Sequence, residues 1–347
     1  MPPALRVLWL TDRIPGHHNT ARGILHVLQN DRPLEVDEFV VRWRLAPVRH
    51  LFCRLGNPGL KFPPQYLLKS LPAGRDYDLI LSAGGHTQWL NAVLARRDSI
   101  PNIFAGSLRH YPPDAFRVIP HFLQSDPPYF PIEFPPSYIS PKLAAESARI
   151  YFPDVPTRSW CVLIGGTGEN YIWTKRRWRL LAEQLVENSR RAGYGLLIAT
   201  SRRTTRAGER ELQKILIPSG QVLAADWYYN RPAAPPPLMA FMGAASQILV
   251  TADSVSMTYE AIASGRPVLS IRPHDCQISD QLRIILGRQK QAGRVAEILL
   301  GPQNRYDSVA PEQGWTPLDS APQPDLAARF WDRLGLATSP LPMKAAG

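Results

Sequence analysis

Two successive runs of alternating strands and helices constrain the fold of this chain more than any other feature of its sequence. In the first run, the short apolar segments 5–10 and 78–82 have the character of buried parallel strands, and each is followed by a loop and a helical pattern. The second run repeats this order after the segments 160–164, 195–200 and 248–251. The alternation predicts an α/β fold with two Rossmann-like, doubly wound domains facing a cleft.

A proline-crowded stretch at residues 125–141 separates the two runs. Proline lacks the N–H that ladders and helices use, so the stretch is predicted to be a linker or a peripheral loop. We therefore expect an N-terminal domain over residues 1–150 and a C-terminal domain over 151–320. Residues 321–347 would form a final helix and tail, which either closes the second domain or crosses back to the first.

The charge of the chain limits its partners. A formal net charge of +11 over 347 residues favours polyanions such as phosphorylated substrates or an anionic membrane surface. No recognised nucleic-acid motif accompanies it, so nucleic acid is not an expected partner. The three cysteines lie far apart, and neither a signal peptide nor an apolar run of about 18 residues is present. We expect a cytoplasmic protein without a membrane span.

Ligands of open parallel sheets bind where the strands end, so the loops after strands carry the functional prediction. After strand 248–251 a helix begins, and helix N-termini bind phosphate through free N–H groups. Glu260 lies one turn after Ser256, on the same face, where a carboxylate suits the hydroxyls of a ribose. The alternative is a capped helix with Glu260 in solvent. The predicted donor residues here are Asp253, Ser254, Ser256, Met257 and Glu260.

Two further loops of the second domain suit a donor phosphate. Glycines after strand 160–164 allow close approach of the backbone to phosphate, and arginines after strand 195–200 offer bidentate contacts. Adjacent arginines point to different sides, so one of the pair is expected to serve, and the sequence does not say which. A tight turn and a solvated loop are the alternatives. The residues concerned are Gly165, Gly166, Thr167, Ser201, Arg202 and Arg203.

Two loops of the first domain are predicted to face an acceptor. A histidine after strand 5–10 suits general-base work on an acceptor hydroxyl, with a purely structural histidine as the alternative. The loop after strand 78–82 is predicted either to contact the acceptor or to form a plain tight turn. These acceptor-side candidates are Gly16, His17, Asn19, Gly84, Gly85 and His86.

Several of these segments carry a family resemblance. The helix with Glu260, followed by Gly265-Arg-Pro267, is similar to the donor-nucleotide motif of GT-B glycosyltransferases, and most of all to the peptidoglycan transferase that adds N-acetylglucosamine to its lipid-linked precursor. More closely, the chain resembles bacterial members of the "elongated mitochondria" fission-protein family, which is glycosyltransferase-like. The segments that resemble this family are 10–19, 164–166, 200–204 and 250–257.

The resemblance implies a GT-B-like architecture and a function. The donor would be a nucleotide-sugar held near Gly166 and Thr167, and His17 would be the catalytic residue, because it occupies the family's Gly-His position. The family tends to carry basic residues where this chain has Gly85 and His86, so their role does not follow from it. We expect a glycosyltransferase acting on a cell-envelope or lipid-linked acceptor. A nucleotide-sugar epimerase of the same fold and a non-catalytic scaffold are the alternatives.

Metal and membrane contacts complete the predictions. No Asp-Xaa-Asp pair lies in the loops predicted to hold the donor, so no metal and no cofactor are expected, and the helix dipole with basic side chains would neutralise the leaving diphosphate. The segment 172–179 places Trp173 and Trp178 among four basic residues. Either this segment attaches the protein to the cytoplasmic face of a membrane, or the tryptophans pack in the core with the arginines in solvent. A third alternative is that its basic residues serve the donor phosphates, because the segment follows the glycine loop.

Overall fold

A computed structural model describes residues 4–45, 64–72, 74, 76–108, 111–156, 158–168, 172–276, 278–301, 315–316 and 325–336. Cys53, one of the three cysteines of the sequence, lies outside these ranges. The described chain is an α/β structure with parallel sheets, which confirms the predicted fold class. It divides into two compact units, which are described separately: unit 1 comprises Met1–Tyr138 with Ala321–Gly347, and unit 2 comprises Ile139–Ser320.

Unit 1 is built on a four-stranded parallel sheet with the order β2-β1-β3-β4. Its central strand β1 is buried along almost its whole length, because it has a neighbour on each side and helices over its faces. The strands are β1 (Leu5–Thr11), β2 (Leu34–Val40), β3 (Leu79–Ala83) and β4 (Asn102–Ala105), and the helices are α1 (Pro15–Gln29), α3 (Pro64–Leu67), α4 (Gln88–Asp98) and α11 (Leu326–Leu334).

Helix α1 begins earlier than its apolar spacing indicates. The spacing predicts a helix over residues 20–30 after a loop, whereas the structure starts the helix at Pro15. Proline suits the first helical position, where its missing N–H has no partner to lose. His17 therefore lies in the first turn of a helix and not in a loop.

The proline-rich stretch is not a simple linker. It contains β6 (Tyr129–Pro131), which pairs with β5 (Ile119–His121) in a small parallel sheet. Phe130 of β6 stacks on the fully buried Phe330 of α11, with ring centroids 4.6 Å apart. This contact, together with the packing of α11 on α1, places the last described helix in unit 1.

Unit 2 is built on a six-stranded parallel sheet with the order β12-β11-β10-β7-β8-β9. Read along the chain, this is the strand order of the dinucleotide-binding Rossmann fold, in which the order reverses next to the first strand. The strands are β7 (Ser159–Ile164), β8 (Gly195–Thr200), β9 (Val222–Asp226), β10 (Gln247–Thr251), β11 (Val268–Pro273) and β12 (Val295–Leu300).

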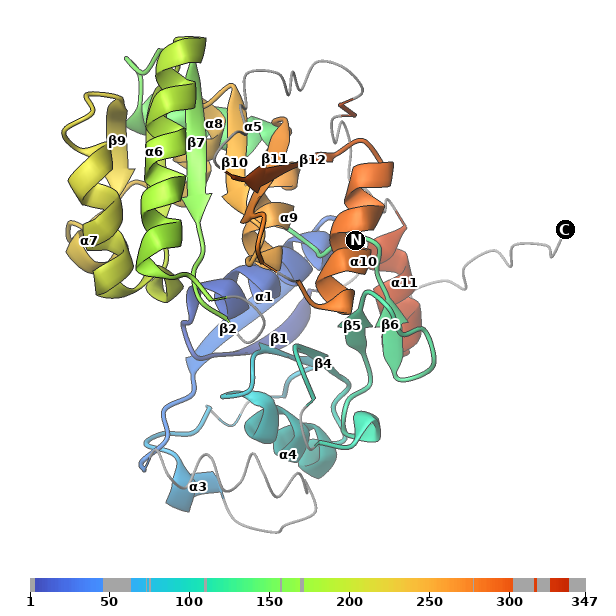
Figure 1. The fold of residues 1–347 in the computed structure, drawn as a ribbon. Helices are drawn as coiled ribbons and strands as arrows, with labels where there is room; N and C mark the ends of the chain where they lie inside the picture. The colour runs from blue at the N-terminus through green and yellow to red at the C-terminus, as the bar shows by residue number, and fades with distance from the viewer. Residues whose placement is uncertain are drawn as a thin grey trace, which may run out of the picture. The chain divides into compact units, whose positions relative to one another are not determined.

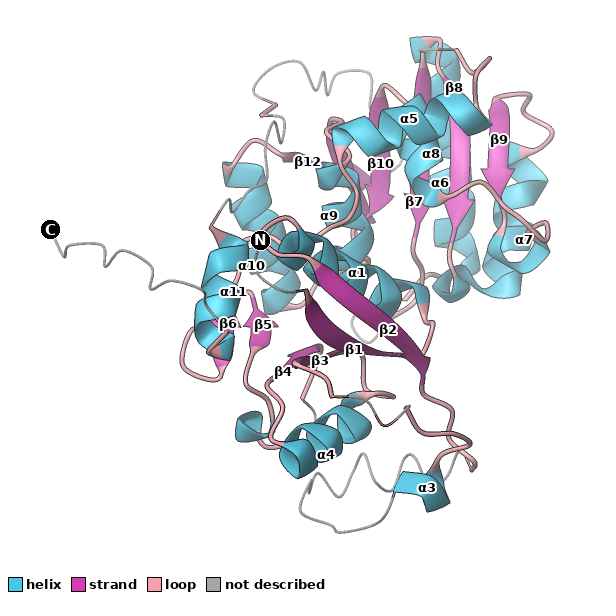
Figure 2. Cartoon of the chain, turned by 180° about the vertical axis from the view of Figure 1, so that it is seen from behind, coloured by secondary structure: helices cyan, strands magenta, loops and turns pink. Residues whose placement is uncertain are grey.

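Helices cover both faces of the unit 2 sheet. Helices α6 (Lys175–Ala192) and α7 (Thr205–Leu216) lie over one face, and α5 (Pro141–Tyr151) and α8 (Leu238–Ala244) lie over the other (Figures 1 and 2). The pattern predicted a domain boundary after residue 150, but α5 belongs to unit 2. The reason is its close packing on α8, where a Cβ at Gly243 would lie 1.9 Å from the Ala144 carbonyl oxygen.

The tryptophans of segment 172–179 are core residues. Trp173 and Trp178 are 6% and 4% exposed and stack on each other with centroids 4.2 Å apart. Their predicted use at a membrane interface is therefore wrong, and the alternative of core packing is confirmed. Basic neighbours in this segment form ion pairs, Arg179 with Glu211 at 3.0 Å among them. Within the described parts of the chain, no helix has both the length and the apolar character needed to cross a membrane.

Candidate functional site

The strand order of unit 2 reverses between β7 and β10, and this switch point gathers most of the predicted donor residues. Loops that leave adjacent parallel strands on opposite sides open a crevice at the carboxyl ends. Gly165 and Gly166 follow β7, and Asp253 and Ser254 follow β10. The loop with Ser201 follows β8, the other neighbour of β7. The three loops that the sequence singles out separately therefore meet at one edge of the sheet.

The glycine loop needs its glycines because other backbone lies against it. A Cβ at Gly166 would lie 2.0 Å from the carbonyl oxygen of Arg203, and its φ of +155° also favours glycine. A Cβ at Gly165 would lie 2.1 Å from a carboxylate oxygen of Asp253. Thr167 is exposed, and its hydroxyl accepts a hydrogen bond from the Trp173 N–H. The two glycines therefore allow the loops to pack against each other, in addition to any role in ligand binding.

Ser201 and Thr204 join the β8 loop to the β7 loop. Ser201 Oγ donates to the Gly165 carbonyl at 2.8 Å, and Thr204 Oγ1 donates to the same oxygen at 2.6 Å. The two residues also form a reciprocal capping box around the single turn η2 (Arg202–Thr204). Thr205 then has φ +65° and ψ +154°, a conformation that costs a β-branched residue about 1–3 kcal/mol. The surrounding hydrogen bonds stabilise this strained turn and fix the position of the two arginines.

Asp253 binds all three loops together. Its side chain is 1% exposed; Oδ2 accepts the Gly166 N–H at 2.7 Å, and Oδ1 accepts the Trp173 indole N–H at 3.2 Å. Arg203 places Nη2 3.3 Å from Oδ2. Burial raises the pKa of Asp253, and the charge of Arg203 and the N–H donors oppose that rise. Because its carboxylate is enclosed, Asp253 holds the loops together and is not exposed to a ligand.

The two arginines differ in a way that the sequence does not reveal. Arg203 is anchored on Asp253 with its side chain still 34% exposed, and a Cβ at Gly168 would lie 3.6 Å from its Nη1. Arg202 is exposed and makes no side-chain hydrogen bond or ion pair with a described residue. An arginine held in place loses less entropy on binding phosphate. The geometry therefore favours Arg203.

Helix α9 (Val255–Ala263) begins directly after the β10 loop. The first backbone N–H that bonds within this helix is that of Thr258, which donates to the Ser254 carbonyl. The backbone N–H groups of the helix before Thr258 therefore remain available to an anion. The Ser254 side chain is 3% exposed and does not cap the helix. Ser256 is exposed and Glu260 is partly buried one turn later. Met257 is likewise partly buried in this first turn.

Unit 1 has its own switch point, between β1 and β3. The predicted acceptor residues follow these two strands, and the structure adds one that the sequence patterns missed. Asp12 is the first residue after β1, and its side chain is 3% exposed. Its Oδ1 accepts the Ile14 N–H at 3.0 Å, and its Oδ2 lies 2.9 Å from His17 Nδ1. The sequence feature that could have pointed to Asp12 is its place directly after the carboxyl end of a buried strand.

Two imidazoles lie close to the carboxylate of Asp12, and one of them is hydrogen-bonded to it. His86 Nδ1 lies 3.5 Å from the same Oδ2 that His17 approaches. Burial disfavours the charge of Asp12, but the hydrogen bonds from His17 and Ile14 and the nearby imidazoles outweigh it and hold its pKa below the ordinary value. An ionised carboxylate only accepts, so the bonded Nδ1 of His17 carries the proton. In the neutral ring, Nε2 is then free to accept one.

The glycines of unit 1 have different roles. Gly84 has φ +82°, and a Cβ there would lie 2.0 Å from His17 Nδ1, so glycine makes room for the ring. Gly16 has nothing within 4 Å of an added Cβ and is not required by packing. Gly85 follows Gly84 in the β3 loop, and Asn19 lies on α1 two residues after His17. The structure therefore brings together His17, Gly84 and His86.

His18 is separated from this group by its packing. Its ring lies 4.6 Å from Trp9, and burial lowers its pKa, with Glu38 acting in the opposite direction. Among the described residues no group of three or more His, Cys, Asp or Glu side chains is arranged to hold a metal ion. The absence of a metal requirement stays a prediction.

Comparison with solved structures defines the fold class. A putative UDP-N-acetylglucosamine 2-epimerase from Listeria monocytogenes is similar with TM-score 0.54 and 11% identity, over 94% of this chain and 91% of that one. UDP-GlcNAc 2-epimerase from Neisseria meningitidis gives 0.51 and 14%, over 88% and 90%. A UDP-glucosyltransferase from Polygonum tinctorium gives 0.50 and 11%, over 96% and 89%. Identities this low show the fold alone, which is the GT-B fold of glycosyltransferases and related epimerases.

The sequence also has a family. The family described as Mitochondrial fission ELM1 matches residues 15–296, and the chain belongs to it. No curated protein matched the chain. The matched region contains His17, the Gly165–Gly166 pair and Glu260, but it ends before α11.

Proposed function

We propose that this chain is a glycosyltransferase that takes a nucleotide-sugar donor through unit 2 and activates an acceptor hydroxyl through unit 1. The observation that carries the proposal is the pairing of Asp12 with His17 at the switch point of unit 1. A buried carboxylate that leaves one imidazole nitrogen bare suits a general base. The Asp12–His17 pair lies in unit 1, whereas the loops suited to phosphate lie in unit 2. The pair is therefore suited to activating a second substrate.

The donor diphosphate would lie at the switch point of unit 2. The free N–H groups of α9, the glycine loop and Arg203 supply positive potential there without a metal ion. Glu260, one turn into α9, would accept hydrogen bonds from the ribose hydroxyls. Gly166 and Thr167 would approach the phosphates from the β7 side.

The proposed transfer step uses the residues of both units. His17 Nε2 takes the proton of the acceptor hydroxyl, and the acceptor oxygen forms a bond to the anomeric carbon of the sugar. The bond from that carbon to the diphosphate oxygen breaks, and the nucleoside diphosphate leaves with the electron pair. Asp12 stabilises the imidazolium that forms, as a buried carboxylate does in other histidine bases.

The acceptor class follows from charge. A chain with a formal charge of +11 attracts an acceptor that carries phosphate, which fits the lipid-linked or cell-envelope acceptors predicted from the resemblance. A cytoplasmic protein would meet such an acceptor at the inner membrane surface. Attachment through Trp173 and Trp178 is not part of the proposal, because both are buried.

The first test is nucleotide binding. UDP, GDP, CMP and ADP are added in turn and the unfolding temperature of the chain is followed; a ligand at about 100 times its Kd stabilises by ~2.7 kcal/mol. Glu260→Gln should weaken binding of the preferred nucleotide about tenfold or more. Glu187→Gln, on the exposed side of α6, is the matched control and should change nothing. Stabilisation by none of the four nucleotides would contradict the proposal.

The second test separates the three functions. The nucleotide-sugar with the preferred base is incubated with and without a lipid-linked acceptor, and both nucleoside diphosphate and sugar products are measured. Acceptor-dependent release of the diphosphate supports a transferase. Sugar isomers without an acceptor would indicate an epimerase, and nucleotide binding without turnover would indicate a scaffold.

A further inference from the structure

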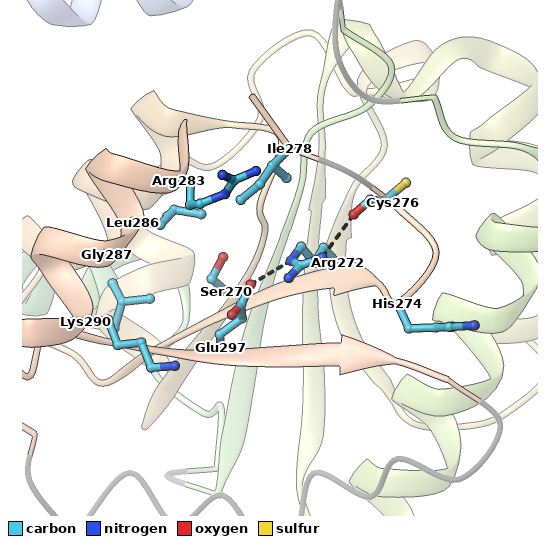
Figure 3. A pocket seen from close by; sticks show the side chains of 11 residues that line it. Ser270, Arg272, His274, Cys276, Ile278, Arg283, Leu286, Gly287, Lys290 and Glu297 are labelled. Atoms are coloured by element: carbon cyan, nitrogen blue, oxygen red, sulfur yellow. Dashed lines mark hydrogen bonds and ion pairs between the residues drawn. The ribbon is translucent and has the colours of Figure 1, made fainter. Parts of the chain in front are cut away.

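A pocket of about 490 Å³ lies in unit 2 between α10 (Asp280–Gln291) and the strands β11 and β12 (Figure 3). It is not at the switch point, which lies between β7 and β10. Its walls come from one face of the two strands and from the side of α10 that covers that face. All its lining residues belong to unit 2.

The sheet face in this pocket is polar where packing predicts an apolar one. Along β11, Leu269 and Ile271 point into the apolar core, so Ser270 and Arg272 point to the opposite face. Glu297 of β12 lies beside Ser270 in the parallel register. Strands covered by helices on both faces are normally apolar throughout. Polar residues at consecutive positions on this face therefore call for a polar partner.

Two of these side chains lack hydrogen bonds that burial makes valuable. Ser270 is 1% exposed, and its hydroxyl has no hydrogen-bond partner among the described residues. Arg272 donates from Nε to Glu297 at 2.6 Å and from Nη1 to the Cys276 carbonyl at 3.0 Å (Figure 3). Its Nη2 makes no bond to any described residue, although the side chain is only 19% exposed. Unmade hydrogen bonds of buried groups disfavour the empty pocket.

The charge of the lining is positive. Arg272, Arg283 and Lys290 contribute three cationic groups, and Glu297 contributes one carboxylate, which Arg272 already binds. Arg283 and Lys290 come from α10 and are exposed, and Arg283 reaches Asp280 at 2.9 Å in a solvent-exposed pair. Exposed ion pairs of this kind are weak, so Arg283 is free to turn to an anion. Lys290 forms no ion pair with a described residue and is exposed.

Gly287 keeps the pocket open. It lies in the middle of α10, where alanine would be the better helix former, and an added Cβ would meet nothing within 4 Å. Its lack of a side chain is therefore not explained by packing or by an unusual backbone angle. It does preserve space on the pocket side of the helix.

From these observations we infer that the pocket binds a small phosphate ester. The phosphate accepts hydrogen bonds from Arg272 and Ser270 and is neutralised by Lys290 and Arg283. A volume of about 490 Å³ falls in the range of small-molecule sites and leaves room for an organic group beside the phosphate. This site is independent of the proposed glycosyltransferase function, since none of its residues is used there.

The test measures binding of ribose 5-phosphate, ribose and inorganic phosphate to the full chain by isothermal titration calorimetry. Ribose 5-phosphate should bind, and ribose should bind at least tenfold more weakly. Gly287→Leu, which fills the pocket, should weaken ribose 5-phosphate binding at least tenfold. Ser270→Ala and Lys290→Gln should each weaken it about threefold to tenfold. Lys142→Gln, on the exposed face of α5, is the matched control and should change nothing.

A further variant separates this pocket from the switch point. Arg203→Lys should leave ribose 5-phosphate binding unchanged; loss in this variant together with full binding in Gly287→Leu would place the ligand at the switch point and overturn the inference. No binding at millimolar ribose 5-phosphate, or equal binding of ribose, would also overturn it. Inorganic phosphate binding as tightly as the ester would overturn the assignment of an organic ligand. Should Gly287→Leu fail to fold, Gly287→Ala combined with Ser270→Ala replaces it.

Discussion

The two units place their candidate residues at the same topological position but give them opposite chemistry. In unit 1 the switch point between β1 and β3 holds a carboxylate with two histidines, a group suited to moving protons. In unit 2 the switch point between β7 and β10 holds glycines, an arginine and a helix N-terminus, a group suited to holding phosphate. The fold fixes where a ligand binds, whereas the loop residues decide what chemistry is available there.

A buried aspartate follows a central strand in each unit, and the pKa values of the two shift in opposite directions. Asp12 accepts a main-chain N–H and orients a histidine, and its pKa lies below the ordinary value although burial opposes this. Asp253 accepts a main-chain N–H and anchors Arg203, and burial raises its pKa. The lowered pKa of Asp12 favours its charged form beside His17, while Asp253 joins the loops of unit 2. This difference makes the two sites separable by mutation.

The largest expected effect comes from His17 in unit 1. His17→Ala should lower turnover by roughly 10²–10⁴-fold, because the acceptor would lose its proposed general base. Nucleotide affinity should stay close to that of the unmodified protein, because unit 2 is unchanged. Turnover measured under saturating donor, and affinity measured by calorimetry, check the two parts.

The adjacent histidine is the matched control for this variant. His18→Ala removes a ring that packs on Trp9 and does not approach Asp12 within hydrogen-bond distance, so turnover should change little. Equal loss of turnover and nucleotide affinity in His17→Ala would show a structural role and remove the contrast between the units.

The next effect belongs to the glycine loop of unit 2. Gly166→Ala should force the β7 and β8 loops apart, because its Cβ would lie 2.0 Å from the Arg203 carbonyl oxygen. We expect a loss of about 1–3 kcal/mol in the free energy of unfolding, with weaker nucleotide binding. Gly168→Ala meets only the flexible end of Arg203 at 3.6 Å and should be tolerated. Identical unfolding curves for the two variants would contradict the contact between the loops.

The pH dependence of Asp12 gives a smaller effect. Asp12→Asn should lower the free energy of unfolding by roughly 1–2 kcal/mol at pH 7, because His17 and the Ile14 N–H lose a charged acceptor. Since the folded-state pKa of Asp12 is lowered, its contribution is complete above about pH 4 and is lost as the pH falls through that pKa. Urea unfolding at pH 7 and pH 3 should therefore show a difference that shrinks in acid.

Asp98 provides the comparison for this measurement. Its pKa is also lowered, chiefly by the hydrogen bond from Arg97, but the pair is exposed on the surface. Asp98→Asn should cost less than ~1 kcal/mol at either pH. If Asp12→Asn lost more free energy of unfolding at pH 3 than at pH 7, the direction assigned to the pKa shift of Asp12 would be wrong.

The smallest effect decides between the paired arginines. Arg203→Lys keeps the charge and loses the two-pronged geometry, so nucleotide affinity should fall about tenfold. Arg202→Gln should change it less than about twofold, because that side chain is exposed and unanchored. The dissociation constants are compared by calorimetry. A larger loss of nucleotide affinity in Arg202→Gln than in Arg203→Lys would indicate that the phosphate lies on the exposed side of η2, next to Arg202.

Sequence periodicity predicted the strands of both sheets well where they are buried on both faces. Gly195–Thr200 was placed with its observed bounds, because a parallel strand covered on two sides is a continuous apolar run. The pattern does not reveal strand β12, because Glu297 interrupts its apolar run and the strand lies at the edge of the sheet. Helix α10 was missed as well, since its polar residues and Gly287 weaken the helical pattern.

The candidate site was predictable as a set of loops but not as a set of contacts. His17 and Glu260 follow from their positions after strands and from the resemblance. The enclosure of Asp253 does not, because it depends on Trp173 and Gly166, which are far from it in sequence. Asp12 was overlooked for the same reason, since only the folded chain shows that two histidines converge on it.

The return of the chain to unit 1 matters for biosynthesis. Helix α11 follows unit 2 along the chain, yet its fully buried Phe330 belongs to the core of unit 1, most of which precedes unit 2. Unit 2 is continuous in sequence and able to fold as it leaves the ribosome. Unit 1 keeps an apolar surface uncovered until α11 emerges. A truncation that removes α11 would therefore damage unit 1 before unit 2, and a chaperone that protects nascent chains would have its main task there.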